Sequence, residues 1–258
     1  MADLETLVLD RDGAVLTVTL SRPERKNALD ARMATELLDL FGTVAFDDDV
    51  RVLVLTGAGD AFCSGADLGS LTPDTHGLAH MRDLHRVAQT LHDLPQPTIA
   101  KINGVAAGAG LNIALGCDLT VASTEARFSE IFARRGLSTD FGGAWLLPRL
   151  VGLHRAKELA LLAEVLPAAE AERLGLVNRV VPPAELDAAV DEWAQRLAAG
   201  PPIALAQTKR MLNRSVETSW EAMLDQESTA QAVNFSTKDM AEAMRAFFEK
   251  RDPSFEGR

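Results

Sequence analysis

Three glycine-rich segments carry the clearest chemical potential in this 258-residue sequence. They are 56–59 (Thr-Gly-Ala-Gly), 63–68 (Cys-Ser-Gly-Ala-Asp-Leu) and 103–110 (Asn-Gly-Val-Ala-Ala-Gly-Ala-Gly). Such segments present backbone N–H groups that no bulky side chain covers, and the third opens an expected helix, whose N-terminus carries unpaired donors and partial positive charge. Two such donors that converge on one oxygen form an oxyanion hole, worth about 3 kcal/mol per donor in a transition state. Tight packing is the alternative interpretation of either segment taken alone.

Other uses of these residues fit less well. The segment 103–110 spaces its glycines as G-x-x-x-G-x-G, which is not the G-x-G-x-x-G pattern of dinucleotide-binding loops, and neither a Walker A sequence nor a G-x-S-x-G nucleophile elbow occurs. Cys63 and Cys117 have no metal-ligand spacing, and the five histidines form no H-E-x-x-H pattern. We therefore expect reduced thiols and no metal site.

The segments that must position these loops alternate between strand and helix patterns over the first half of the chain, which is typical of an α/β fold. Strands are expected at 6–10, 15–20, 50–56, 98–103 and 119–122, with a hairpin turn at Asp12-Gly13. Helices are expected at 27–46, 75–93, 108–115, 143–150, 153–162, 168–174, 183–199, 202–214, 220–233 and 238–250. The continuous β-branched run at 50–56 predicts a strand covered on both faces.

Charge and hydropathy limit the partners. With 26 basic and 37 acidic side chains the formal net charge is −11, so nucleic-acid binding is not expected. No window approaches 18 uninterrupted apolar residues, and the acidic start of the chain lacks a basic-then-apolar leader. We expect no membrane span and a cytoplasmic location.

Three ordered motifs, 22–29 (Arg-Pro-Glu-Arg-Lys-Asn-Ala-Leu), 59–68 and 102–110, resemble the signature of the crotonase (enoyl-CoA hydratase/isomerase) superfamily. The resemblance covers essentially the whole chain. It implies an α/β spiral of ββα units at 1–200, followed by a helical oligomerisation region at 201–258. It also implies an acyl-CoA thioester substrate, no cofactor beyond the coenzyme A of that substrate, and a homotrimer or dimer of trimers. The apolar side chains Trp220, Met223, Phe235 and Phe247 along the last helices fit a subunit contact, with packing on the chain's own core as the alternative.

The resemblance also implies roles for individual residues. The oxyanion-hole donors would be the N–H groups of Ala66 and Ala109. Residues that would hold the thioester or its coenzyme A are Arg25, Lys26, Gly65, Asp67, Leu68, Gly108 and, from the chain itself or a neighbouring subunit, Lys250.

The catalytic side chains depart from the hydratase pattern of that family, in which two glutamates position and deprotonate water. Asn112 and Phe132 occupy those two places, so hydration by two glutamates is in doubt. The segment 136–149 resembles the isomerase branch that acts in phenylacetate breakdown, which implies that Asp140 is the catalytic carboxylate. An N-cap of the following helix is the alternative role for Asp140. Phe132 and Phe141 would exclude water and raise the pKa of that carboxylate.

The leading hypothesis from the sequence is therefore an acyl-CoA double-bond isomerase with Asp140 as acid and base. The rivals are an enoyl-CoA hydratase that uses Asp140 or Glu130, and a non-catalytic subunit that binds CoA thioesters. As we align it, His85 falls at a position that holds a histidine in the dehalogenase branch, which leaves hydrolytic chemistry open. The side-chain direction of Glu130 is not determined by the sequence, and residues 70–91 are expected to cover the acyl pocket.

Overall fold

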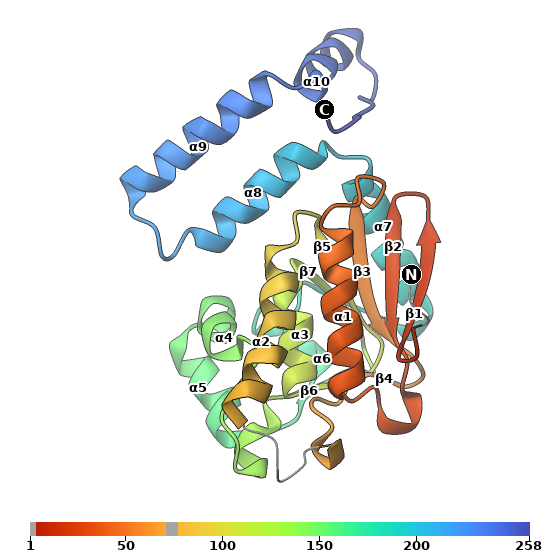
Figure 1. The fold of residues 1–258 in the computed structure, drawn as a ribbon, viewed down its shortest axis with the longest axis vertical. Helices are drawn as coiled ribbons and strands as arrows, with labels where there is room; N and C mark the ends of the chain where they lie inside the picture. Colours follow the sequence, from red (N-terminus) through yellow and green to blue (C-terminus); the bar gives the residue numbers. More distant parts are fainter. Residues whose placement is uncertain (1–3, 71–76) are drawn as a thin grey trace.

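A mixed sheet forms the centre of the computed structural model, which describes residues 4–70 and 77–258 (Figure 1). Over these residues the sheet has six strands in the order β1-β2-β3-β5-β7-β10, and all neighbouring pairs are parallel except β1 and β2. The strands are β1 (Leu7–Asp12), β2 (Val15–Leu20), β3 (Val52–Gly57), β5 (Thr98–Ile102), β7 (Leu119–Ser123) and β10 (Arg179–Val181).

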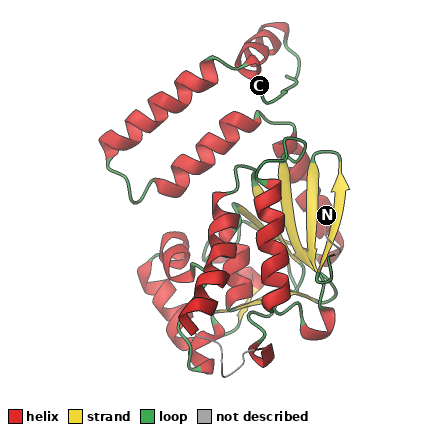
Figure 2. Cartoon of the chain, viewed as in Figure 1, coloured by secondary structure: helices red, strands yellow, loops and turns green. Residues whose placement is uncertain are grey.

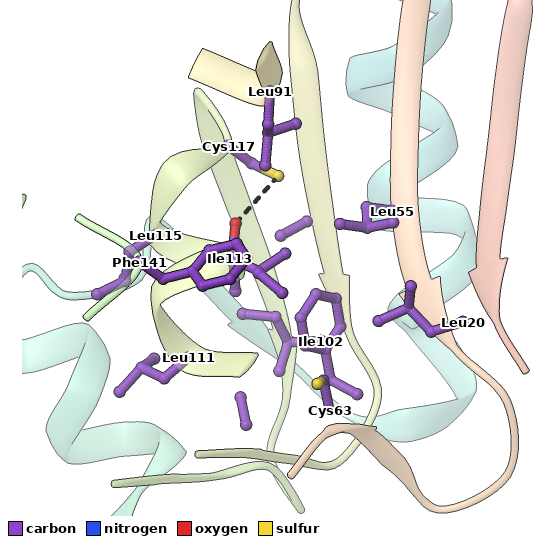
Figure 3. Close-up of a cluster of buried hydrophobic side chains, with 14 of the residues drawn as sticks. Leu20, Leu55, Cys63, Leu91, Ile102, Leu111, Ile113, Leu115, Cys117 and Phe141 are labelled. Atoms are coloured by element: carbon purple, nitrogen blue, oxygen red, sulfur yellow. Dashed lines mark hydrogen bonds between the residues drawn. The ribbon is translucent and has the colours of Figure 1, made fainter. Parts of the chain in front are cut away.

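Strand β3 is buried on both faces, as its β-branched sequence predicts. Leu53 and Leu55 belong to one hydrophobic core and Val52 and Val54 to a second, because successive side chains of a strand point to opposite faces. The first core lies under the helices α1 (Ala31–Val44), α2 (Gly77–Asp93) and α3 (Ala109–Gly116), and Figure 3 shows part of it around Leu55. Helix α7 covers the second core on the other face.

A smaller sheet carries the glycine-rich segments. Its order is β4-β6-β8-β9, with β4 (Ala61–Cys63), β6 (Val105–Ala107), β8 (Arg127–Ser129) and β9 (Leu166–Pro167). The sequence did not indicate these strands, because two or three residues are too few for a periodic pattern. The carboxyl ends of β4, β6 and β8 lead directly into residues 64–68, 108–110 and 130, so the small sheet brings these segments together.

The helices agree closely with the predicted ranges. They are α1 (Ala31–Val44), α2 (Gly77–Asp93), α3 (Ala109–Gly116), α4 (Gly143–Val151), α5 (Leu153–Leu162), α6 (Ala168–Arg173), α7 (Leu186–Ala198), α8 (Pro202–Arg214), α9 (Trp220–Phe235) and α10 (Lys238–Glu249), with short 3₁₀ helices at Pro23–Arg25, Leu68–Ser70, Ile131–Arg135 and Pro183–Glu185. The predicted positions 75–76 lie outside the described residues.

Several predicted boundaries are wrong by a few residues, and two of these differences have clear local reasons. Helix α1 begins at Ala31 and not at residue 27, because the side chain of Asp30 caps it by accepting the Met33 N–H at 2.9 Å. The first hairpin turns at 13–14, since Asp12 still pairs with Val15.

The last three helices form an arm that extends away from the sheets (Figures 1 and 2). Helices α8 and α9 run side by side, and Lys209 on α8 ties the arm to the body through the Asp118 carboxylate at 2.7 Å. Trp220, Phe235 and Phe247 are exposed, so they do not pack on the chain's own core, whereas Met223 is half-buried. A subunit contact through this arm stays a prediction. No helix within the described parts of the chain is long and apolar enough to cross a membrane.

Candidate active site

The segment around Ala66 is held as a short piece of extended chain. Leu29 and Ala66 form a parallel β-bridge, in which the Leu29 N–H donates to the Gly65 carbonyl at 2.8 Å and the Asp67 N–H donates to the Leu29 carbonyl at 2.8 Å. Because alternate peptide groups of an extended chain point in opposite directions, the N–H of Ala66 points away from Leu29.

The second predicted donor, Ala109, is the first residue of α3. Its N–H belongs to the first turn of the helix, where amides have no intrahelical partner. Gly108 precedes it with φ +53° and ψ −129°, and its own N–H donates to the Ser129 carbonyl at 2.9 Å. A side chain is strained at this φ, which explains the glycine. The small sheet thus fixes where α3 begins.

The two donor segments lie against each other. A Cβ on Gly110 would approach the Cys63 carbonyl oxygen to 2.2 Å, so only glycine lets α3 start this close to β4. A Cβ on Gly65 would lie 2.9 Å from the Ala107 oxygen and 3.7 Å from the Ala109 nitrogen, and Gly65 has φ +103°. The structure therefore brings residues 65–66 and 108–109 together, as an oxyanion hole requires.

Asn112 and Asp140 adjoin this pair of donors. Asn112 lies three residues after Ala109 on α3, about 4.5 Å farther along the helix axis. Its side chain is buried, and Nδ2 donates to the backbone carbonyl of Asp140 at 2.9 Å. Gly143 allows this contact, because a Cβ there would lie 2.4 Å from the Asn112 Nδ2. Asn112 therefore links the turn that carries Asp140 to helix α3.

The Asp140 carboxyl group is half-buried and does not cap α4. The N-cap of α4 is Gly142, which makes no side-chain cap hydrogen bond, and the Asp140 main-chain carbonyl accepts the Gly143 N–H at 2.9 Å. The N-cap interpretation of Asp140 is wrong for this reason. Its Oδ1 is buried and has no hydrogen-bond partner among the described residues. Burial raises the pKa of Asp140 to about 6, the direction expected for a carboxylate in apolar surroundings.

Both predicted aromatic residues are buried near the site. A Cβ on Gly108 would lie 3.5 Å from the Phe132 ring, so Phe132 packs beside the start of α3. Phe141 lies among the core side chains next to Leu115 and Ile113 of α3 in Figure 3. Neither residue can supply the carboxylate that the two-glutamate pattern needs.

The predicted coenzyme A residues Arg25 and Lys26 lie beside the Ala66 segment. Their side chains are exposed, and the Ser64 N–H donates to the Lys26 carbonyl at 3.0 Å. Asp67 accepts a hydrogen bond from Arg22 at 2.9 Å, which holds the pKa of Asp67 below its usual range, so its side chain helps to anchor the loop. Leu68 is exposed and offers apolar surface there.

Lys250 and His85 lie apart from the oxyanion-hole segments. Lys250 is the C-cap of α10, and Figure 1 shows α10 on the arm, remote from β4 and β6, so this chain does not bring Lys250 to its own site. A contribution from a neighbouring subunit stays a prediction. His85 lines a cavity of about 990 Å³ between α2, α3, α4 and α8. Asn112 and Phe141 line that cavity, but Ala66, Ala109 and Asp140 do not. The cavity therefore lies next to the predicted catalytic groups and does not contain them.

Glu130 is the residue whose role the sequence left unresolved. It follows β8 and is only 2% exposed. Phe128, Ser129 and Glu130 are all buried, so the alternation that usually separates inward from outward positions is absent here. Burial raises the pKa of Glu130 to about 8, and the negative charge of Asp140 adds to this effect, while Asn112 lowers the pKa in part.

Comparison with known proteins identifies the family of the chain. Residues 10–258 match the enoyl-CoA hydratase/isomerase family. The chain belongs to this family, which is part of the crotonase superfamily. The chain is 36% identical to 1,2-epoxyphenylacetyl-CoA isomerase from Escherichia coli over 99% of this chain and 100% of that protein, which also supports the likeness to the phenylacetate branch.

Other members of the family carry other activities in their names. The chain is 37% identical to the short-chain-enoyl-CoA hydratase of Clostridium acetobutylicum, over 96% of this chain and 97% of that protein. The crystal structure of an enoyl-CoA hydratase from Bacillus anthracis superposes with a TM-score of 0.94 at 32% identity, over 98% of this chain and 100% of that one. The chain therefore has the crotonase fold, and the reaction must be argued from its own side chains.

Proposed function

We propose that the protein is an acyl-CoA double-bond isomerase that works through an enolate, with Asp140 as its single acid and base. The observation that carries the proposal is the half-buried Asp140 carboxyl group with a pKa of about 6, held by Asn112 one helical turn from the Ala109 N–H. A base of this pKa is ionised at neutral pH and still accepts a proton readily. Two relatives are named as isomerases, one of 1,2-epoxyphenylacetyl-CoA and one of a trans-2-decenoyl group on acyl carrier protein, which supports isomerisation as the class of reaction.

The proposed mechanism follows from where charge develops. The thioester carbonyl oxygen accepts hydrogen bonds from the Ala66 and Ala109 N–H groups. Asp140 removes a proton from C2 of a 3-enoyl thioester, and the electron pair delocalises over the dienolate onto the carbonyl oxygen. The two amides stabilise that oxygen by about 3 kcal/mol each. The protonated Asp140 then returns the proton to C4, which leaves the double bond between C2 and C3.

Double-bond migration needs one carboxylate, whereas hydration also needs a water oriented by a second group. Asn112 uses one of its N–H bonds on the Asp140 carbonyl, and Phe132 has no polar atom in its side chain. We therefore favour isomerisation over hydration. Exposed Arg25 and Lys26 beside the Ala66 segment are proposed to bind the phosphates of coenzyme A, which an acidic protein must hold with local cations.

The proposal is tested by incubating the protein separately with a 3-enoyl-CoA and a 2-enoyl-CoA. Migration of the double bond without net addition of water is the expected result. Asp140→Asn should lower the isomerisation kcat by about 10²- to 10⁴-fold while leaving thioester binding intact. Asp39→Asn, which changes an exposed carboxylate on α1, serves as the matched control.

Three results would overturn the proposal that the protein is an isomerase with Asp140 as its base. Addition of water to the 2-enoyl-CoA as the main reaction supports the hydratase, and binding without turnover supports the non-catalytic subunit. Full isomerase activity in Asp140→Asn means that another group is the base.

A further inference from the structure

Glu130 is a buried carboxyl group that the proposed reaction does not use. It is 2% exposed, and neither of its oxygens has a hydrogen-bond partner among the described residues. A buried carboxylate without a partner is strongly disfavoured, so such a group either keeps its proton or finds a donor. Its side chain is more deeply buried than that of Asp140, which is half-buried.

The unpartnered atoms of this region belong to three neighbouring residues. Among the described residues, six buried side-chain oxygens lack a hydrogen-bond partner, and four of them are the Asn112 Oδ1, both oxygens of Glu130 and the Asp140 Oδ1. All four atoms are acceptors when the carboxyl groups are ionised. The second N–H of the Asn112 amide can serve only one of them, so the cluster is short of donors, and a proton on Glu130 would supply another.

Asn112 is the group that such a donor can orient. Its Nδ2 already donates to the Asp140 carbonyl at 2.9 Å, and its Oδ1 has no partner. The amide of Asn112 lies close enough to Glu130 to lower its pKa in part, although no hydrogen bond of normal geometry joins the two side chains. A hydrogen bond from a protonated Glu130 to the Asn112 Oδ1 would complete the chain from Glu130 through Asn112 to Asp140.

The charges around Glu130 favour its neutral form. From the turn before α4 it faces the carboxyl group of Asp140, and from α3 it faces the neutral amide of Asn112. Within the part of the chain that the structure describes, no cation acts on it to favour ionisation. Burial and the Asp140 charge together raise the pKa of Glu130 to about 8.

We propose that Glu130 is a positioning residue that, as a neutral carboxylic acid, donates a hydrogen bond from its O–H to the Asn112 Oδ1 and so orients the amide that holds Asp140. This role rests on the proposed function of Asp140 as the base. This hydrogen bond gives a partner to both the Glu130 carboxyl group and the Asn112 Oδ1. With Glu130 neutral, Asp140 is the single negative charge of the cluster. When Glu130 loses its proton at alkaline pH, its carboxylate oxygen, which can only accept, faces the Asn112 Oδ1. The two oxygens repel each other, which would displace the Asn112 amide and the turn at Asp140.

Two variants test the proposal through the isomerase reaction. Glu130→Gln keeps a neutral donor of nearly the same shape, so its kcat at neutral pH should stay within about threefold of wild type. Glu130→Leu removes the donor, so its kcat should fall by about 10- to 100-fold with little change in KM. Wild-type activity should decline as pH rises through about 8, and Glu130→Gln should lack this decline.

A spectroscopic measurement tests the proton without relying on turnover. The infrared spectrum of wild type minus Glu130→Gln near neutral pH should contain a carboxylic-acid C=O band, and Asn112→Ala should shift that band. Absence of the band, or equal loss of kcat in the Gln and Leu variants, would overturn the proposal. If the band is present but the wild type does not move the double bond, the proposed function fails and the Glu130–Asn112 contact stands.

Discussion

Replacing Glu130 by glutamine should make the stability of the folded state less sensitive to a rise in pH from about 5 to about 8. The carboxyl group of Glu130 has an ordinary pKa of 4.5, and burial raises it to about 8 in the folded chain. Between these values the unfolded chain loses a proton that the folded chain keeps. The folded state therefore binds more protons, and the free energy of unfolding decreases as pH rises through this window.

The size of the effect follows from the two pKa values. Each pH unit within the window lowers the free energy of unfolding by about 1.4 kcal/mol. Between about pH 5 and pH 8 the wild type should lose about 3 kcal/mol through this one group. Glutamine does not titrate, so Glu130→Gln should gain that amount relative to wild type over the same range.

Urea denaturation followed by tryptophan fluorescence, at one fixed protein concentration, measures the difference at both pH values. Glu125→Gln is the matched control, because Glu125 is exposed and lies five residues before Glu130. A difference between wild type and Glu130→Gln that does not change with pH would refute the reasoning, since it would mean that Glu130 ionises alike in the folded and unfolded chain.

Two further predictions concern the turn that carries Asp140. The pKa of Asp140 is raised to about 6 and the base acts when ionised, so kcat/KM should rise with pH through about 6 and stay level until Glu130 ionises near pH 8. A pH–rate profile checks this, and a profile flat down to about pH 4 would contradict the assignment. Gly143→Ala should displace the Asn112 amide, lower kcat, and cost about 1–3 kcal/mol in stability by overpacking. Gly116→Ala on α3 meets only the Leu91 side chain at 3.7 Å and should have little effect on kcat; comparable losses in both variants would show that the Asn112 contact is unimportant.

Elements with long periodic patterns could be predicted from the sequence. Strand β2 and helices α5 and α8 have the predicted bounds, because each has a full set of apolar positions and a proline, glycine or turn signal at its ends. The small sheet could not be predicted this way. Its strands β4, β6 and β8 are only three residues long, and they exist because neighbouring chain segments pair with them.

The candidate site also has features that the sequence could predict and features that it could not. The types and spacing of residues near Ala66, Ala109 and Asp140 are visible in the sequence, and they were sufficient to suggest the family and the carboxylate. The sequence could not show that Gly142, and not Asp140, is the N-cap of α4, because aspartate suits both an N-cap and a catalytic acid or base. It also could not show that Gly143 accommodates Asn112, since that contact joins residues 31 positions apart.

By itself, the sequence determined which groups are available: flexible glycines that expose amides, one carboxylate where two glutamates are absent, and an acidic surface with a few local cations. Only the tertiary structure decided which groups meet and how they ionise. The ionisation of Glu130 and Asp140 depends on burial, and burial is a property of packed elements from distant parts of the chain. The sequence therefore shows where a carboxyl group is available, and the fold around that group sets the pH at which it loses its proton.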